Sequence, residues 1–331
     1  MTASERIAVF GCKSTTQFLI ESLEQAGVRV SQLITISPAM GEKHEVADYS
    51  DLADWAKVRG IAVYVAKTYS LKNEQDLATI AAMNLDLAFV IGWQRLIPEG
   101  VLRSLRVGAF GMHGSSMNLP LGRGRSPMNW SILEGRKVFY TNLFQYDPGV
   151  DSGDVVDTFK FQILDTDTGE TMHYKNLLAM KYLIERNLKS LLSGHYSLSG
   201  QRTDLEPTYY PKRSPSDGAI DWRLDVFQLE RFIRAVTRPF AGVFTFIGTE
   251  RITIWSATVF DHEEYGYGNL KEGQIAAVFP SGKFLVKAFG GLLLVQEYEG
   301  ATPAIGTLMH AGGATIKVFP RNSQGYFDVE E

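Results

Sequence analysis

The chain has 331 residues, which corresponds to about two domains. Its hydrophobic fraction of 45% and charged fraction of 21% are those of a globular protein, which excludes disordered, collagen-like and low-complexity classes. The formal net charge of −4 argues against sequence-independent binding of nucleic acid, because such binding depends on Lys and Arg neutralising phosphates. The single cysteine, Cys12, excludes an internal disulfide framework and a zinc site built from cysteines.

The hydropathy pattern gives no sign of a membrane segment. No apolar run approaches the roughly 18 residues that a spanning helix requires. The first strand is expected to begin by residue 7, and no apolar leader precedes it. We therefore expect a cytoplasmic protein without a membrane partner.

The first 112 residues alternate between short apolar strands and segments with helical spacing. Strands are predicted over 6–11, 28–37, 61–66, 85–91 and 107–112, and helices over 16–25, 52–58, 74–83 and 98–105. This alternation predicts an α/β fold with a doubly wound, mainly parallel sheet. Ligands bind such sheets at the carboxyl ends of the strands, where the segments 92–98 and 113–127 are expected.

Residues 127–331 are expected to complete this first domain and then to form a second one. A helix over 127–134, strands over 137–146 and 155–163 and a long helix over 168–193 complete a catalytic domain over 1–195. Residues 196–217 have the polar, Pro- and Ser-rich composition of a linker. A domain over 218–331 follows, with a helix at 225–236 and then a small β-barrel. Its strands are expected at 244–248, 251–260, 273–279, 284–291, 292–300 and 315–319.

The segment 111–154 contains the residues best suited to chemistry. His113 follows a buried strand, and Asp151 lies in a turn between two strands 38 residues later. A histidine and a carboxylate brought together at a strand end can perform general acid–base work on an amine or an acyl group. A capping or packing histidine and a turn-forming aspartate explain the same residues, so the alternative stays open at this point. No motif typical of a nucleotide-binding loop or a metal site is found.

Three motifs occur in order in this segment: GMHGS at 111–115, LPLGRGRSP at 119–127 and DSGD at 151–154. Together they resemble the pattern of N10-formyltetrahydrofolate-dependent formyltransferases, which reads NxHxS, then LPxxRGxxP, then DxGD. Further likeness in 209–222 and 239–255 extends the resemblance over nearly the whole chain. The run RGRSPMNW at 123–130 is most similar to members that formylate nucleotide-linked amino sugars.

The resemblance implies a formyltransferase that uses N10-formyltetrahydrofolate as co-substrate and needs no metal. It assigns acid–base catalysis to His113 and the role of its carboxylate partner to Asp151. The folate would contact Arg95, Leu96, Ile97, Arg125, Asp147, Pro148, Gly149 and Val150. Ser115 and Trp93 are implied on the side of the acceptor. Without the resemblance, Arg95 and Arg125 would be interpreted as solvated surface charges.

Gly111 departs from the family pattern, which has Asn two residues before the histidine. In the family that amide stabilises the formyl oxygen as it becomes an oxyanion, and loss of one such donor costs about 2.7–4 kcal/mol. Asn118, in a loop two residues longer than usual, is the expected substitute, while protonated His113, a water molecule or Asn129 are the alternatives. We expect room for an asparagine at position 111, unless the glycine marks a close approach to a ligand.

The resemblance implies a small-molecule amine acceptor, most plausibly a nucleotide-linked amino sugar, and allows a homodimer. A methionyl-tRNA formyltransferase-like enzyme is one alternative. It is disfavoured because the loop 36–50 carries two basic and three acidic residues, counting His44 as charged. From Leu205 onward there are 12 Lys and Arg against 15 Asp and Glu, so no nucleic-acid partner is expected. A catalytically weak folate- or sugar-binding homologue is the other alternative, motivated by Gly111. The sequence does not identify the sugar.

Overall fold

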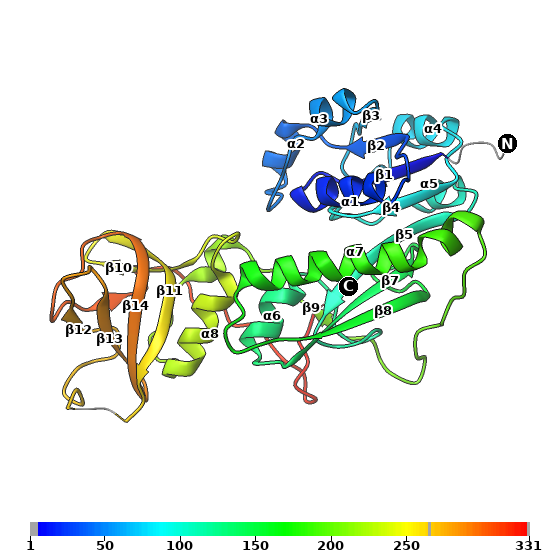
Figure 1. Ribbon diagram of the computed structural model, residues 1–331. Coiled ribbons are helices and arrows are strands. Elements are labelled where there is room, and N and C mark those ends of the chain that lie inside the picture. Colours follow the sequence, from blue (N-terminus) through cyan, green and yellow to red (C-terminus); the bar gives the residue numbers. More distant parts are fainter. Residues whose placement is uncertain (1–5, 264–265, 330–331) are drawn as a thin grey trace. The chain divides into compact units, whose positions relative to one another are not determined.

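The computed structural model describes residues 6–263 and 266–329, which belong to two compact units (Figure 1). The first unit comprises residues 1–123, 140–161 and 175–208, and the second comprises 124–139, 162–174 and 209–331. Two stretches from the middle of the chain thus belong to the second unit. The domain boundaries expected from the sequence remain a proposal. The expectation about a leader falls on residues 1–5, which lie outside the described residues.

The first unit contains a seven-stranded mixed sheet with the strand order β3-β2-β1-β4-β5-β7-β8. Its strands are β1 (Ile7–Phe10), β2 (Gln32–Thr35), β3 (Ala62–Val65), β4 (Leu87–Val90), β5 (Gly108–Ser115), β7 (Val138–Gln145) and β8 (Val155–Gln162). The first five pair in parallel, and β7 pairs antiparallel with β5. This arrangement confirms the predicted mainly parallel sheet.

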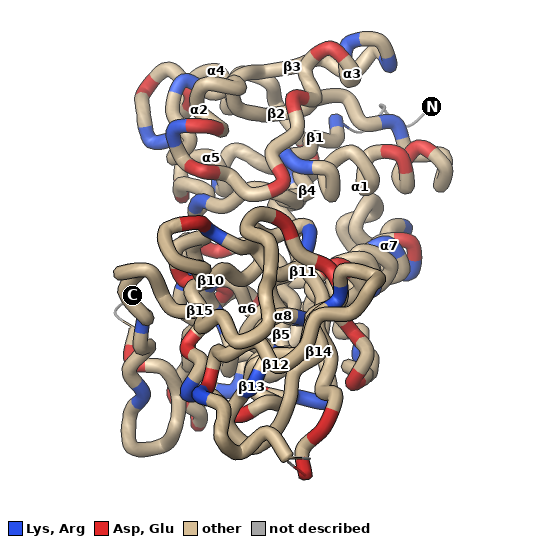
Figure 2. The backbone as a smooth tube through the Cα atoms, turned by 90° about the vertical axis from the view of Figure 1, so that its left-hand side faces the viewer, with Lys and Arg blue, Asp and Glu red and all other residues tan. Residues whose placement is uncertain are grey.

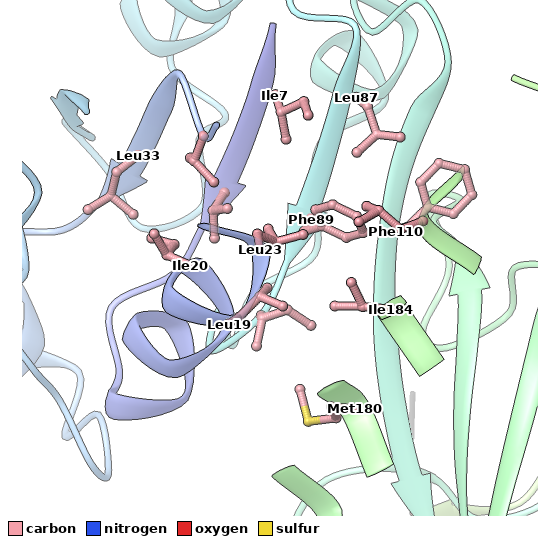
Figure 3. Close-up of a cluster of buried hydrophobic side chains, with 14 of the residues drawn as sticks. Ile7, Leu19, Ile20, Leu23, Leu33, Leu87, Phe89, Phe110, Met180 and Ile184 are labelled. Atoms are coloured by element: carbon pink, nitrogen blue, oxygen red, sulfur yellow. The ribbon is translucent and has the colours of Figure 1, made fainter. Parts of the chain in front are cut away.

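Helices cover both faces of this sheet. They are α1 (Ser14–Gln25), α2 (Pro38–Lys43), α3 (Ala53–Val58), α4 (Glu74–Ala82), α5 (Glu99–Arg103) and α7 (Gly169–Ser193). On one face, apolar residues of α1, α3 and α7 pack on alternate strand residues such as Val9 and Phe89. Figure 3 shows Leu19 of α1 and Ile184 of α7 in this layer, together with Phe89. On the other face, α4 and α5 pack on the intervening residues, such as Ala8 and Val90. The period-two alternation of the strands therefore divides the core into two layers.

The second unit consists of a curled antiparallel sheet and the helices α6 (Pro127–Leu133) and α8 (Val226–Val236). Its strands follow the order β12-β13-β14-β11-β10-β15. They are β10 (Val243–Ile247), β11 (Glu250–Asp261), β12 (Ile275–Val278), β13 (Phe284–Ala288), β14 (Gly291–Gly300) and β15 (Met309–His310). An isolated bridge between Gln274 and Leu308 brings the two ends of this sheet together. The result is a six-stranded half-barrel, which confirms the predicted C-terminal fold. Short elements β6 (Arg123–Gly124), β9 (Tyr209–Tyr210) and a 3-10 turn at Pro215–Gly218 complete the chain.

Two local predictions were wrong. The segment after β2 was expected to be a loop, but it contains α2, which begins where the Ser37 hydroxyl accepts a hydrogen bond from the Met40 amide. The segment 315–319 was expected to be a strand but forms none, and Val318 is 82% exposed. The sixth strand of the half-barrel is β15 instead.

Within residues 6–263 and 266–329, no helix combines the length and the apolar character needed to cross a bilayer.

Candidate functional site

His113, on β5 where that strand pairs with β7, meets Asp151 from the turn between β7 and β8. His113 lies opposite Asn142 in this pairing, and its side chain is 7% exposed. Its Nδ1 lies 3.2 Å from Oδ2 of Asp151. Its Nε2 lies 2.7 Å from the backbone carbonyl of Gly122, which can only accept a hydrogen bond. The structure thus brings together the two residues in which the sequence suggested acid–base chemistry.

The turn after β7 fixes the position of Asp151. Asp151 adopts a left-handed backbone conformation with φ of 49°, which aspartate tolerates better than most residues. The Asp147 side chain accepts hydrogen bonds from the Gly149 amide at 3.1 Å and the Ser152 hydroxyl at 2.6 Å. Asp147 therefore closes the turn, which leaves the backbone of 147–150 as the part available for the predicted folate contacts.

Gln201 holds the same turn from outside, and sequence reasoning missed it. Its side-chain amide donates to the backbone carbonyls of Asp151 at 2.8 Å and Gly153 at 2.9 Å. Its own carbonyl accepts from the guanidinium of Arg123 at 2.7 Å. The residue lies in the segment that the sequence analysis assigned to a linker, and a single polar residue in such a segment carries no signal of its contacts.

The expectation of free room at Gly111 was wrong. A Cβ atom added there would lie 2.2 Å from Cε2 and 3.1 Å from Cζ of Tyr146, and 3.0 Å from the carbonyl oxygen of Val90. The aromatic ring of Tyr146 therefore occupies the space into which a side chain at position 111 would extend. The glycine does mark a close approach, but the approaching group is a side chain of this protein.

The asparagines considered as substitutes for the missing amide differ in their surroundings. The side chain of Asn118 is exposed, and its backbone carbonyl accepts from the Leu121 amide in a turn. In the second unit, buried Asn129 donates its amide to the carbonyl of Ala235 at 2.7 Å. Asn142, which the sequence analysis did not consider, is fully buried. Its Oδ1 accepts from Thr158, and its Nδ2 has no partner among the described residues.

The segment after β4 presents one exposed and one buried apolar side chain. Leu96 is 42% exposed, whereas Ile97 is 1% exposed and packs in the core, so that only its backbone is available to a ligand. The guanidinium of Arg95 lies 5.1 Å from the ring centre of Tyr69 and 3.5 Å from Nδ1 of His44. Arg95 is therefore packed against its neighbours and is not the fully solvated charge of the alternative interpretation.

The remaining predicted residues are largely buried. Trp93 is 7% exposed and packs edge-on against Phe10 and Tyr69. Ser115 is fully buried, and its hydroxyl accepts from the Met117 amide at 3.3 Å. Arg125 belongs to the second unit, where its backbone amide donates to the carbonyl of Tyr210. The ligand contacts expected of Trp93, Ser115 and Arg125 stay predictions.

A separate cavity of about 430 Å³ lies within the second unit. Basic side chains dominate its polar lining, among them Arg136, Arg231 and Arg234, and it includes none of the predicted site residues. In the part of the chain that the structure describes, no group of three or more His, Cys, Asp and Glu could hold a metal ion.

Comparison with known proteins places these features in a family. The family model described as formyl transferase matches residues 5–185, and the model of the formyl transferase C-terminal domain matches residues 212–311. The fold is similar to that of an N-formyltransferase from Helicobacter canadensis, whose structure holds folinic acid and dTDP-3-aminofucose. That match has 16% identity and a TM-score of 0.63, and it covers 89% of this chain and 100% of that one.

Two other solved structures show the same fold. Methionyl-tRNA formyltransferase from Clostridium thermocellum matches with 16% identity and a TM-score of 0.54, over 90% of this chain and 100% of that one. HypX from Aquifex aeolicus in complex with tetrahydrofolic acid matches with 16% identity and a TM-score of 0.59, over 99% of this chain and 51% of that one. With matches to both the catalytic and the C-terminal family models, the chain belongs to the formyl transferase family.

Proposed function

We propose that this enzyme transfers a formyl group from N10-formyltetrahydrofolate to the amine of a nucleotide-linked amino sugar. The observation that carries the proposal is the contact between His113 on β5 and Asp151 in the turn after β7. Support for the two substrates comes from the Helicobacter canadensis relative, whose structure contains a folate derivative and a dTDP-linked amino sugar.

The reaction needs one proton to be moved between two nitrogens. The acceptor amine attacks the formyl carbon, a new C–N bond forms, and the bond from that carbon to N10 of the folate breaks. The amine loses a proton, and N10 gains one. His113 is suited to carry this proton because an imidazole both accepts and donates near neutral pH, while Asp151 orients the ring through Nδ1.

The ring nitrogen of His113 that exchanges the proton is Nε2. In this structure Nε2 is bonded to the Gly122 carbonyl, so a substrate nitrogen has to take the place of that carbonyl before a proton can move. The folate contacts are proposed for the exposed side of the 92–97 segment, through Arg95 and Leu96, and for the backbone of the 147–150 turn. The mixed charge of the chain favours a small acceptor over tRNA.

A panel of amines tests the proposal. The enzyme is incubated with N10-formyltetrahydrofolate and UDP- or dTDP-linked amino sugars, and the gain of one formyl group by the sugar is followed by mass spectrometry. His113→Asn, which keeps a polar side chain of similar size but cannot shuttle the proton, is the matched control. Transfer to at least one sugar that His113→Asn abolishes is the expected result. Absence of transfer to every sugar, with the folate bound, would leave only a binding protein.

A further inference from the structure

The proposed transfer step creates a negative charge, and the asparagine with which the family pattern stabilises that charge is glycine in this chain. When an amine attacks the formyl carbon, the formyl oxygen becomes an oxyanion and needs a hydrogen-bond donor about 3 Å away. Gly111 supplies no side chain, and the inference below rests on the proposed formyl transfer. The structure offers a different group at this position.

The ring of Tyr146 lies over Gly111 with its hydroxyl end nearest. The two ring atoms closest to an added Cβ are Cε2 and Cζ, and Cζ is the atom that bears the hydroxyl. Gly111 and His113 are alternate residues of β5, so they face the same side of the sheet about 7 Å apart. The hydroxyl end of Tyr146 therefore lies beside Gly111, two residues before His113 on β5 and on the same face of the sheet.

Packing holds the Tyr146 ring in this place. Its backbone amide donates to the carbonyl of Ala109 at 2.8 Å, which continues the pairing of β7 with β5. Its ring stacks on Phe144, with ring centres 5.0 Å apart and planes inclined by 25°. Phe144 itself is opposite Gly111 in the strand pairing and almost fully buried. A ring fixed between two strands loses little further freedom when its hydroxyl binds a ligand, which favours a preorganised donor.

The hydroxyl of Tyr146 is available and remains protonated. Among the residues that the structure describes, no side chain or backbone group is hydrogen-bonded to it. Burial and, second, the negative charge of Asp151 raise the pKa of Tyr146 well above its ordinary value. The phenol is therefore a donor throughout the pH range in which such an enzyme is assayed.

We propose that the Tyr146 hydroxyl donates a hydrogen bond to the formyl oxygen as it becomes an oxyanion, and that Gly111 is required to make room for its ring. The amide of Asn142, another group that has no partner among the described residues, is a weaker candidate. It is fully buried, and its carbonyl is already bonded to Thr158. Tyr146 and Gly111 thus form a complementary pair, in which the large residue directly after β7 supplies the donor and the missing side chain on β5 admits it.

Tyr146→Phe tests this role because it keeps the ring and its packing and removes only the hydroxyl. We expect kcat for formyl transfer to fall by about 10²–10³, the usual effect of losing one oxyanion donor, with the dissociation constant of the folate nearly unchanged. Tyr196→Phe is the matched control. It removes the hydroxyl of another tyrosine of the same unit, which contacts Val107 and Gln145, and should leave kcat nearly unchanged.

A swap of the donor provides the second test. Gly111→Asn alone should be inactive or unstable, because its side chain collides with the Tyr146 ring. In the double variant Gly111→Asn with Tyr146→Ala the ring is gone, and kcat should exceed that of Tyr146→Ala alone by about tenfold or more, as a new amide donor reaches the oxygen.

The outcomes separate the two proposals. If the wild-type enzyme transfers formyl groups and Tyr146→Phe keeps full turnover, the role of Tyr146 is overturned while the proposed function stands. The role of Tyr146 as an oxyanion donor is also overturned if Tyr146→Phe weakens folate binding by as large a factor as it lowers kcat. The residue would then act in binding the folate, and the proposed function would still stand. If the wild-type enzyme transfers no formyl group, both proposals fall together.

Discussion

The two ring nitrogens of His113 face groups that accept hydrogen bonds. The Gly122 carbonyl at Nε2 only accepts, and an ionised Asp151 at Nδ1 does the same. Both contacts are satisfied by an imidazolium beside a carboxylate, or by a neutral imidazole beside a protonated acid. In the proposed reaction, the proton held between these groups passes to N10 of the folate when its bond to the formyl carbon breaks.

From this arrangement we expect Asp151 to be as important for turnover as His113. We expect His113→Asn and Asp151→Asn each to lower kcat by about 10² or more, the usual contribution of a general acid–base residue. Asparagine is the suitable replacement at position 151, since it tolerates the left-handed backbone conformation, which is unfavourable for alanine. Single-turnover transfer rates measure the effect. Near-full turnover in either variant would contradict the assigned roles.

Sequence reasoning at this scale indicated that His113 and Asp151 lie together, which the structure shows, but it did not predict what surrounds them. His113 and Asp151 could be predicted because each stands in a short motif with a known order and spacing. The contact between Gly111 and the Tyr146 ring could not be predicted, because it depends on the register in which β5 pairs with β7. No local sequence pattern fixes that register. Room for an asparagine at position 111 was therefore expected, although the ring of Tyr146 fills it.

The turn between β7 and β8 depends on a residue that does not touch the catalytic histidine. Gln201 joins the carbonyls of Asp151 and Gly153 and is itself held by Arg123. We expect Gln201→Glu to lower kcat by about tenfold, or about 1.4 kcal/mol, because a carboxylate repels both carbonyls and displaces Asp151. Arg202→Ala is the control, since that side chain pairs only with exposed Asp204.

A double-mutant cycle shows whether Gln201 acts through the pair. In a background that already carries Asp151→Asn, Gln201→Glu should have little further effect on the transfer rate. Equal effects in both backgrounds would mean that Gln201 only stabilises the fold.

The loop between β3 and α4 is organised around the buried carboxylate of Asp76. It accepts hydrogen bonds from the Tyr64 hydroxyl at 2.6 Å and from the Lys67 and Thr68 amides at 2.9 and 3.0 Å. Burial raises the pKa of Asp76, but these hydrogen bonds outweigh it, and the net effect lowers the pKa below its ordinary value. The loop leads to Tyr69, against which Arg95 is packed.

A lowered pKa in the folded state gives stability that is fully present above the unfolded pKa of about 3.9 and is lost as the pH falls through the folded value. We expect Asp76→Asn to reduce the free energy of unfolding by about 2 kcal/mol at pH 7, as donors lose their charged acceptor. Urea unfolding of both proteins should show this difference shrinking below about pH 4. A difference that does not change with pH would show that the charge of Asp76 is unimportant.

Most elements could be predicted from hydrophobic periodicity, and the exceptions have physical causes. The start of α2 carried a signal that was overlooked, a serine followed by a proline at the first helical position. Residues 315–319 have the composition of a strand, yet a strand also needs a partner with free backbone groups. Lys317 instead pairs with Asp217, and Phe319 packs edge-on against Trp130.

In the backbone view of Figure 2, the positions of Lys and Arg are interspersed with those of Asp and Glu along both units. The segment that contains α2 shows the same balance, with Lys43 and His44 beside Glu42, Glu45 and Asp48. His44 packs against Tyr69 with the ring planes inclined by 51° and contacts Arg95, so it is used within the first unit. The expectation that the chain has no nucleic-acid partner therefore rests on its composition.

The charge of the whole chain leads us to expect an amino sugar, and not tRNA, as the acceptor. A tRNA acceptor requires several Lys and Arg contacts to phosphates, and its affinity then falls steeply with salt. This chain carries 33 Lys and Arg against 37 Asp and Glu, and the acidic excess persists through the C-terminal part. We expect kcat/KM for methionyl-tRNA to lie at least about 10² below that for the preferred amino sugar, and sugar formylation to be insensitive to salt between low and physiological ionic strength. Efficient tRNA formylation that declines steeply with added salt would reverse the assignment of the acceptor, while leaving the chemistry of His113 and Asp151 in place.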